Sequence, residues 1–150
     1  MSKIIEQLKF EEGIRFKRYL CTAGFWTIGY GHNLDKHPYW PDGSKIPNEI
    51  NDRDAEALLW IDVGNTIGSL RQRWPRFDEF DSARRDACIN MAFQLGVSGF
   101  MRFERMRAAM LARDWDSAYW EALKSNWAIQ TPERAKRVSV QIQTGKHYNV

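Results

Sequence analysis

The sequence predicts a single domain in which a short β-structured segment near the N-terminus is followed by a long run of helices. Three observations lead to this expectation. At 150 residues the chain has the length of one domain with a sizeable core. Residues 16–34 combine aromatic and β-branched residues with a central turn, which is typical of strands. Most of the remaining chain carries apolar residues at helical spacing.

The first expected element is a helix that begins after Ser2, a good N-cap, and stops at Gly13. Residues 4–8 supply its apolar stripe. Glu12 falls in the last turn, where the negative end of the helix dipole disfavours a charged carboxylate. A carboxyl group that keeps its proton is what a general acid needs, so Glu12 is a candidate for that role. The alternative is a solvated side chain at a helix end.

Residues 16–34 are expected to form strands that turn at Thr22-Ala23-Gly24. Gly29 and Gly31 mark positions where the backbone bends sharply or approaches another group closely. Residues 35–48 hold three prolines and an Asp-Gly pair, so a loop or an irregular hairpin is expected there.

A long helix is expected from Asp52, capped by Asn51, to Trp74-Pro75. Asp62 falls inside its apolar stripe, and a carboxylate in such a place needs a partner. His32, at the end of the predicted strands, is the candidate partner.

A second helix, nearly free of charge, is expected from Phe80-Asp81 to Gly96 as the buried centre of the helical part. Asn90, Phe93 and Gln94 lie toward its end. Polar residues on so apolar a helix indicate either a wall that faces a cleft or hydrogen bonds within the core, and the pattern favours neither. Three further helices are expected over 100–112, after Asp114, and from Thr131-Pro132 onward.

The formal charge of +3 is unevenly distributed along the chain. Residues 1–100 contain 13 Lys/Arg and 14 Asp/Glu, whereas residues 101–150 contain 9 and 5. A basic C-terminal part favours an anionic polymer such as nucleic acid, phospholipid or cell wall, although a solvated helix surface explains it equally well. Two cysteines give no disulfide framework, and the N-terminal residues lack the apolar stretch of a signal peptide, so a reducing cytoplasm is the expected home.

Several blocks of this sequence together resemble the phage-type lysozymes, a family of endolysins. The resemblance covers nearly the whole chain, and the blocks keep their separation. It rests on Glu12-Gly13 with Arg15 and Tyr19, Thr27-Ile28-Gly29-Tyr30-Gly31-His32, Asp54-Ala55-Glu56 with Asp62-Val63, Ala83-Arg84-Arg85, Ile89-Asn90-Met91-Ala92-Phe93-Gln94-Leu95-Gly96, Trp115-Asp116, and Gln130-Thr131-Pro132-Glu133-Arg134-Ala135-Lys136-Arg137-Val138.

The resemblance implies an α+β, lysozyme-like fold and hydrolysis of the β-1,4 bond between N-acetylmuramic acid and N-acetylglucosamine in peptidoglycan. It implies one domain over 1–150, in which a small lobe of roughly 13–58 carries the hairpin. Residues 1–12 and 59–150 are expected to form a larger helical lobe. The long helix from Asp52 is expected to join the two lobes.

The resemblance also implies roles for individual residues. Glu12 matches the general acid of the family, and Thr27 matches a residue that holds the attacking water. Arg134 matches an arginine that pairs with the catalytic glutamate, and His32 and Asp62 match an ion pair. This last match agrees with the partner inferred for Asp62 from the helix pattern.

Cys21 is the main departure, because the best-known member of the family has an aspartate there, although endolysins with cysteine are known. A thiol serves as base or nucleophile only as thiolate, and a free cysteine has a pKa of about 8.5. The neighbours Arg15, Lys17 and Arg18 could lower that pKa. Water activation is the favoured role because Thr27 is retained; direct attack, electrostatic stabilisation and an inert strand residue are the alternatives.

Substrate contacts are also implied by the resemblance. Phe93 and Gln94 match residues that line the sugar-binding region, and Trp127 matches a nearby tryptophan. Asn33, Met106 and Glu121 stand where the best-known member has other residues, so stem-peptide contacts are expected to differ.

The resemblance further implies peptidoglycan glycan strands as the partner, rather than nucleic acid, and a monomer. The expected location is the host cytoplasm until holin-dependent release to the wall in the periplasm. No cofactor is indicated, and the three histidines lack metal-ligand spacing. Two alternative functions are open to this sequence. One is membrane disruption, with anionic lipids as partner, by the basic helices over 100–112 or 132–142, which could accompany the enzyme activity. The other is a catalytically inactive wall-binding module. Glu12 and Thr27 argue against the second of these.

Overall fold

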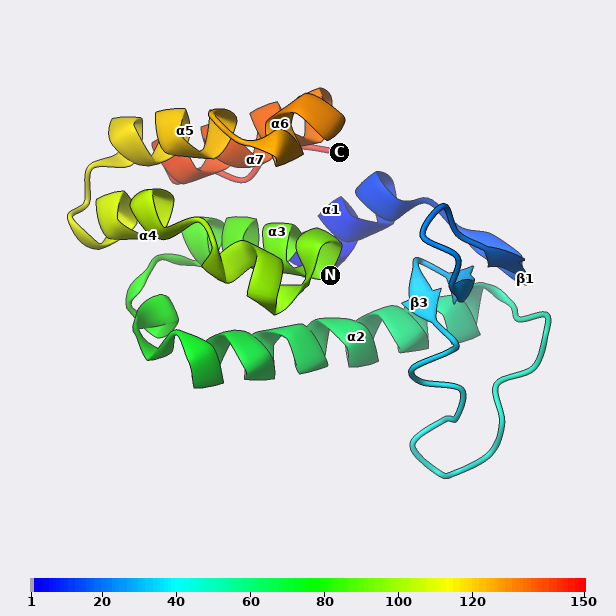
Figure 1. Cartoon of the computed structure of the whole chain (residues 1–150). Helices are drawn as coiled ribbons and strands as arrows, with labels where there is room; N and C mark the ends of the chain where they lie inside the picture. The colour runs from blue at the N-terminus through cyan, green and yellow to red at the C-terminus, as the bar shows by residue number, and fades with distance from the viewer. Residues whose placement is uncertain (1) are drawn as a thin grey trace. The chain divides into compact units, whose positions relative to one another are not determined.

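The computed structural model describes residues 2–150 and has the predicted α+β class (Figure 1). A small antiparallel sheet near the N-terminus is accompanied by helices over most of the other residues. The elements in chain order are α1 (Lys3–Glu12), β1 (Arg15–Leu20), β2 (Trp26–Gly29), β3 (His32–Asn33), α2 (Asp52–Arg73), the 3-10 helix η1 (Pro75–Glu79), α3 (Ser82–Met101), α4 (Glu104–Leu111), α5 (Trp115–Leu123), α6 (Asn126–Gln130) and α7 (Pro132–Thr144).

The chain divides into two compact units, Met1–Gly64 and Asn65–Val150, and the division falls within α2. In this division α1 lies with the sheet, whereas the sequence assigned residues 1–12 to the helical lobe. The assignment of lobes stays a prediction.

The sheet of the first unit has the order β1-β2-β3, so β2 is its central strand. Tyr19 pairs with Thr27, and Leu20 pairs with Trp26, across β1 and β2. The turn between these strands closes where the sequence predicts it: the Cys21 N–H donates to Phe25 O at 2.9 Å. Thr27, the predicted water-holding residue, therefore lies in the centre of the sheet.

The core of the first unit forms where the sheet meets the loop after it and the start of α2. This packing follows from the alternation of β2, in which Ile28 points into the core. Asn51 caps α2 as predicted, because its Oδ1 accepts the Asp54 N–H at 2.9 Å. The buried members are Ile28, Leu34, Ile46, Ile50, Ala55 and Leu58, with Ile14, Tyr30 and Trp40 partly buried around them.

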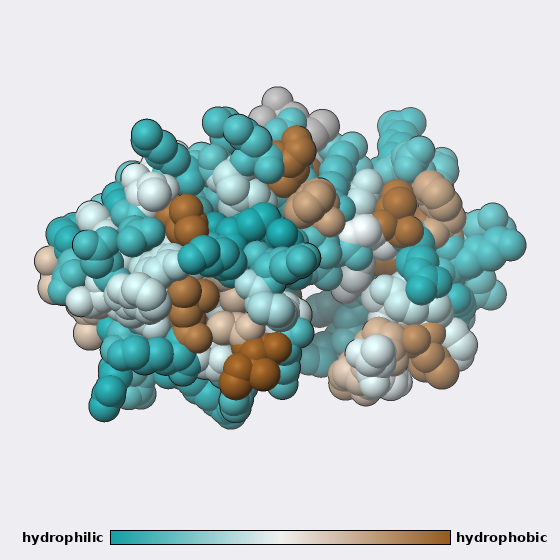
Figure 2. All heavy atoms as spheres, turned by 90° about the horizontal axis from the view of Figure 1, so that it is seen from above, coloured by the Kyte–Doolittle hydropathy of each residue, from teal (hydrophilic) through white to brown (hydrophobic). Residues whose placement is uncertain are grey.

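The second unit is helical, and α7 runs beside α5 while also contacting α3 and α6 (Figure 1). Its fully buried side chains come from all the longer helices, including Leu70, Phe77, Met91, Phe100, Met106, Met110 and Ile142. Among residues 2–150 no helix combines the length and hydropathy needed to cross a membrane. On the face shown in Figure 2, hydrophobic residues form separate patches among hydrophilic ones.

The helices around residue 100 differ from those predicted. Gly96 interrupts the helix where the sequence ends it, with φ 76° and ψ 155°, but a further turn continues α3 to Met101. The single helix predicted over 100–112 is wrong, because α4 begins only at Glu104. Phe103 has a non-helical ψ of 58°, and Arg107 Nη2 donates to Met101 O at 2.5 Å, which satisfies a carbonyl at the end of α3.

Candidate active site

Glu12 ends α1, and its carboxylate lies against the backbone of Gly31. A Cβ added to Gly31 would stand 3.0 Å from Glu12 Oε1 and 3.8 Å from its Cδ. Gly31 also has φ 76°, a conformation that disfavours other residues. The close approach that the sequence expects at Gly31 is therefore an approach to the candidate general acid.

Cys21 lies at the end of β1, at the start of the hairpin turn. A hydrogen bond from the Phe25 backbone lowers the pKa of its thiol, and hydrogen bonds with the Thr27 side chain and the backbones of Ala23 and Gly24 act in the same direction. Partial desolvation opposes them without cancelling them. The turn therefore favours the thiolate, the form in which sulfur acts as a base or a nucleophile.

Two of the basic neighbours of Cys21, Arg15 and Arg18, lie against aromatic rings. The guanidinium of Arg15 lies 4.5 Å from the centroid of the Tyr19 ring, and that of Arg18 lies 4.5 Å from the centroid of the Trp26 ring. Arg18 also donates to Asn48 Oδ1 at 3.0 Å. The donors that favour the Cys21 thiolate come from the turn instead.

Thr27 is buried in the central strand, with 5 % of its surface exposed. Its hydroxyl donates to Phe25 O at 2.9 Å. A hydroxyl has one proton and two acceptor lone pairs, so the oxygen can still accept a hydrogen bond from a water molecule. This suits the role implied for Thr27 by the family resemblance.

The Tyr19 phenol interacts electrostatically with Cys21 and Glu12, and the sequence predicted no role for it. Burial raises the pKa of its phenol; Arg15 lowers it, and the negative charges of Cys21 and Glu12 raise it further. The phenol is thus within electrostatic reach of both Cys21 and Glu12, and its strand position is directly opposite Thr27. Its place in the predicted strand, two residues before Cys21, was the available signal.

His32 and Asp62 form the pair that the sequence predicts, with His32 Nδ1 2.8 Å from Asp62 Oδ2. His32 Nε2 lies 2.8 Å from His37 O, so both ring nitrogens are bonded. Burial lowers the pKa of His32, but the hydrogen bond and charge of Asp62, together with the His37 carbonyl, outweigh it and leave the pKa raised. The pair ties β3 to the middle of α2.

In the second unit, Gln94 and Trp127 form one hydrogen-bonded group with Thr131. The Trp127 Nε1–H donates to Gln94 Oε1 at 2.8 Å, and Gln94 Nε2 donates to Thr131 Oγ1 at 3.3 Å. Trp127 is buried and packs edge-on against Phe103, with ring centroids 5.9 Å apart. The amide of Gln94 is therefore held in one orientation.

A pocket of about 600 Å³ lies beside this group, still within the second unit. Met106, Glu121 and Trp127, three of the predicted substrate-contact residues, line it. Its charged lining includes Arg102, Glu104, Arg105 and Lys124 as well as Glu121, so the pocket presents both basic and acidic groups.

The other predicted contact residues lie elsewhere. Phe93 and Gln94 do not contribute to the lining of this pocket. Asn33 belongs to the first unit, where its Oδ1 accepts the N–H groups of Asp35 and Lys36 at 2.9 and 3.0 Å and so caps a turn.

Arg134 is 8 % exposed and is bound to α3 within the second unit. Its Nε donates to Asn90 Oδ1 at 3.0 Å, and its Nη2 lies 3.4 Å from Asn90 O. Asn90 thus has the core hydrogen-bonding role that the sequence left open. The pairing of Arg134 with Glu12 stays a prediction.

The α+β fold, a small antiparallel sheet followed by helices, is that of a glycoside hydrolase of the lysozyme class. The sequence pattern of the family described as "Phage lysozyme" matches residues 9–139. The chain belongs to the phage lysozyme family.

Named relatives agree with this assignment. "Probable T4-type lysozyme 2" of Dictyostelium discoideum is 30% identical over 164 residues, covering 97% of this chain and 96% of that protein. "Pre-baseplate central spike protein Gp5" of Enterobacteria phage T4 is 36% identical over 158 residues, covering 93% of this chain and 27% of that protein. The chain therefore spans about a quarter of the length of the spike protein. An "Endolysin" of Acyrthosiphon pisum secondary endosymbiont phage 1 is 30% identical over 93 residues, covering 62% of this chain and 57% of that protein.

Proposed function

We propose that this protein is a muramidase that cleaves the β-1,4 bond between N-acetylmuramic acid and N-acetylglucosamine in peptidoglycan. The observation that carries the proposal is a thiol with a lowered pKa in the turn after β1, beside the buried Thr27 hydroxyl of β2. The Glu12 carboxyl group at the end of α1 and the Cys21 thiol both act electrostatically on the Tyr19 phenol. Most glycosidases use one acid to protonate the leaving oxygen and a second group that either activates water or attacks the anomeric carbon. Membership of the phage lysozyme family supports the same substrate.

In the proposed reaction Glu12 gives its proton to the glycosidic oxygen as the bond from that oxygen to the anomeric carbon breaks. A water molecule held by Thr27 attacks the anomeric carbon and transfers a proton to the Cys21 thiolate. The products are two sugars with free hydroxyl groups. The proton on Cys21 then returns to Glu12 through solvent, which restores both groups for another turnover.

Water activation is the role of Cys21 that the geometry favours. The hydrogen bond between Cys21 and Thr27 places the base next to the residue that would hold the water. Direct attack by sulfur would instead leave a covalent glycosyl-enzyme intermediate and retain the anomeric configuration. NMR of the first-formed product distinguishes the two, because attack by activated water inverts the configuration.

The substrate contacts are proposed to involve the pocket of the second unit as well as the sheet. Met106, Glu121 and Trp127 line that pocket, and its mixed charges suit a peptide that carries both carboxylate and ammonium groups. A peptidoglycan stem peptide has this chemistry. Glu121→Gln is expected to raise KM for cross-linked peptidoglycan more than for peptide-free glycan, and an equal effect on both would remove Glu121 from peptide recognition.

The biological role proposed is lysis of the host cell at the end of phage growth, by a monomeric enzyme released from the cytoplasm through a holin. Expression with and without a holin, followed by measurement of the time of lysis, tests this role. Membrane disruption by the basic helices stays a prediction. In α7, Arg134 binds Asn90 and Lys136 binds Tyr119 within the second unit, so these two cations already have partners in the fold.

The deciding experiment for the enzymatic function replaces Glu12 by Gln, which preserves shape but cannot supply the proton. Release of reducing sugars from purified peptidoglycan is expected to fall by on the order of 10²-fold or more. Thermal unfolding of the variant is the control for the fold. A folded Glu12→Gln protein with unimpaired activity would contradict the assignment.

A further inference from the structure

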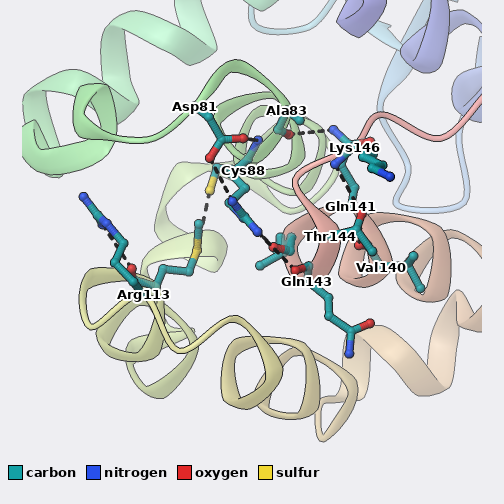
Figure 3. Close-up of polar contacts among 12 residues, drawn as sticks. Asp81, Ala83, Cys88, Arg113, Val140, Gln141, Gln143, Thr144 and Lys146 are labelled. Carbon is teal, nitrogen blue, oxygen red and sulfur yellow. Dashed lines mark hydrogen bonds and ion pairs between the residues drawn. The ribbon is translucent and has the colours of Figure 1, made fainter.

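The residues that follow α7 fold back against α3 and α7 and are bound there at two points. His147 Nε2 lies 2.7 Å from Asp86 Oδ2, with only 12 % and 18 % of the two side chains exposed. The Tyr148 N–H donates to Gln141 Oε1 at 3.3 Å. Gln141 in turn donates from Nε2 to Ala83 O at 2.7 Å, a contact visible in Figure 3. The segment is therefore part of the packed unit.

Tyr148 and Arg134 are joined through a single buried amide. Asn90 is fully buried; its Nδ2 donates to the Tyr148 hydroxyl at 3.0 Å, and its Oδ1 accepts the Arg134 Nε–H at 3.0 Å. Arginine can only donate, so the amide must present its oxygen to Arg134 and its nitrogen to Tyr148. The phenol oxygen accepts from that nitrogen and thereby supports this orientation.

Tyr148 is also held from the helix that carries Arg134. The Arg137 guanidinium lies 5.9 Å from the centroid of the Tyr148 ring, one helical turn after Arg134. The neighbouring residue His147 is itself bound to Asp86 of α3, so the chain on either side of the ring contact is held by α3 and α7. If the phenol oxygen were lost, the buried Asn90 Nδ2 would lose a partner and the amide could turn away from Arg134.

We propose that Tyr148 is a positioning residue that holds the Asn90 amide and, through it, the guanidinium plane of Arg134. The inference rests on the proposed function and on the predicted pairing of Arg134 with Glu12. When the Nε of an arginine is held by a hydrogen bond, its two Nη groups point in a fixed direction. That direction decides how strongly the guanidinium interacts with a carboxylate. No sequence motif marks Tyr148 for this task, because it acts only through Asn90.

The first test compares two Tyr→Phe variants of the full chain. Tyr148→Phe removes the hydroxyl that accepts from Asn90, whereas Tyr119→Phe removes a hydroxyl bonded to Lys136, also on α7. Loss of the cation beside a carboxylate favours its protonated form, so Arg134→Gln is expected to move the alkaline limb of kcat to higher pH. Tyr148→Phe is expected to move it in the same direction and to lower kcat roughly fivefold. Tyr119→Phe is expected to leave the limb in place.

The second test combines the changes. If Tyr148 acts through Arg134, the Arg134→Gln/Tyr148→Phe protein has the pH profile of Arg134→Gln alone. Additive shifts, or a Tyr148→Phe profile identical to wild type, would overturn the proposal. If Arg134→Gln itself leaves the profile unchanged, the role of Arg134 in the proposed function fails. In that case the free energies of unfolding in urea of the two single variants and the double variant show whether Tyr148 and Arg134 are coupled. Coupling in stability without any change of the pH profile means that the contacts are structural only, and this also overturns a positioning role.

Discussion

The carboxylate of Glu12 lies against the Gly31 backbone so closely that a methyl group on Gly31 would stand 3.0 Å from Oε1. The candidate general acid is therefore placed by two elements, the end of α1 and the turn between β2 and β3. A glycine at position 31 is needed both for its φ of 76° and for this clearance.

Gly31→Ala is expected to lower kcat by about tenfold or more, because the methyl group displaces the Glu12 carboxylate from its position. Gly43→Ala is the matched control: its φ is 89°, but nothing lies within 4 Å of an added Cβ. Both variants should lose about 1–2 kcal/mol of stability from backbone strain. Equal activity losses in the two, measured on purified peptidoglycan, would show that strain alone matters.

Cys21→Ala is expected to lower activity by on the order of 10²-fold, since it removes the group that takes the proton from water. Cys21→Asp should keep substantial activity, because a carboxylate can act as the base in the same place. Turnover of the two variants on peptidoglycan makes the comparison. An unimpaired Cys21→Ala enzyme would return Cys21 to a structural role.

The lowered pKa of Cys21 predicts selective thiol chemistry. Alkylation requires the thiolate, so Cys21 should react with iodoacetamide at a lower pH than a free cysteine does. Cys88 is an internal control: it is fully buried, burial raises its thiol pKa, and its Sγ lies 4.0 Å from Met110 Sδ (Figure 3). Mass spectrometry after timed labelling should find modification at Cys21 first, together with loss of activity.

Sequence patterns predicted those parts of the molecule that depend on local chemistry. The end of α1 at Glu12, the hairpin turn and the Asn51 cap each follow from a residue type at one position. The His32–Asp62 contact was predictable because a carboxylate inside an apolar stripe needs a partner.

Features that depend on tertiary packing were not accessible from sequence. The helix predicted over 100–112 failed because the break at Phe103 is stabilised by a side chain from the next turn, Arg107. The hydrogen bonds that lower the Cys21 pKa could not be read from the basic residues near it in sequence, of which Arg15 and Arg18 stack on aromatic rings. Only the folded turn shows that hydrogen bonds from backbone groups, of which that of Phe25 has the largest effect, favour the Cys21 thiolate.

The His32–Asp62 pair predicts a pH-dependent contribution to stability. Because the pKa of His32 is raised above its ordinary value of 6.5, the contribution is fully present below that value. It is lost as pH rises through the folded-state pKa. Asp62→Asn should therefore cost about 1–3 kcal/mol at pH 5.5 and clearly less at pH 9. Urea unfolding at both pH values measures this, and a pH-independent loss would contradict the sign.

Arg84 joins the start of α3 to the end of α7. Its Nε donates to Ile142 O at 2.6 Å and its Nη2 to Gln143 O at 3.1 Å, which satisfies carbonyls left without partners at the end of a helix. Its Nη1 pairs with Asp81 at 3.2 Å, and its guanidinium lies 3.7 Å from the centroid of the Trp115 ring. Asp81 and Gln143 appear with these contacts in Figure 3.

Arg84→Lys is expected to destabilise the protein by about 2 kcal/mol although it keeps the charge, because an ammonium group cannot reproduce the planar fork or its stacking on an aromatic ring. Arg85→Lys, the neighbouring change on α3, is the control and should stay within about 0.5 kcal/mol of wild type. Urea unfolding of the three proteins at one pH compares them directly. If Arg84→Lys were as stable as Arg85→Lys, charge alone would account for the contact.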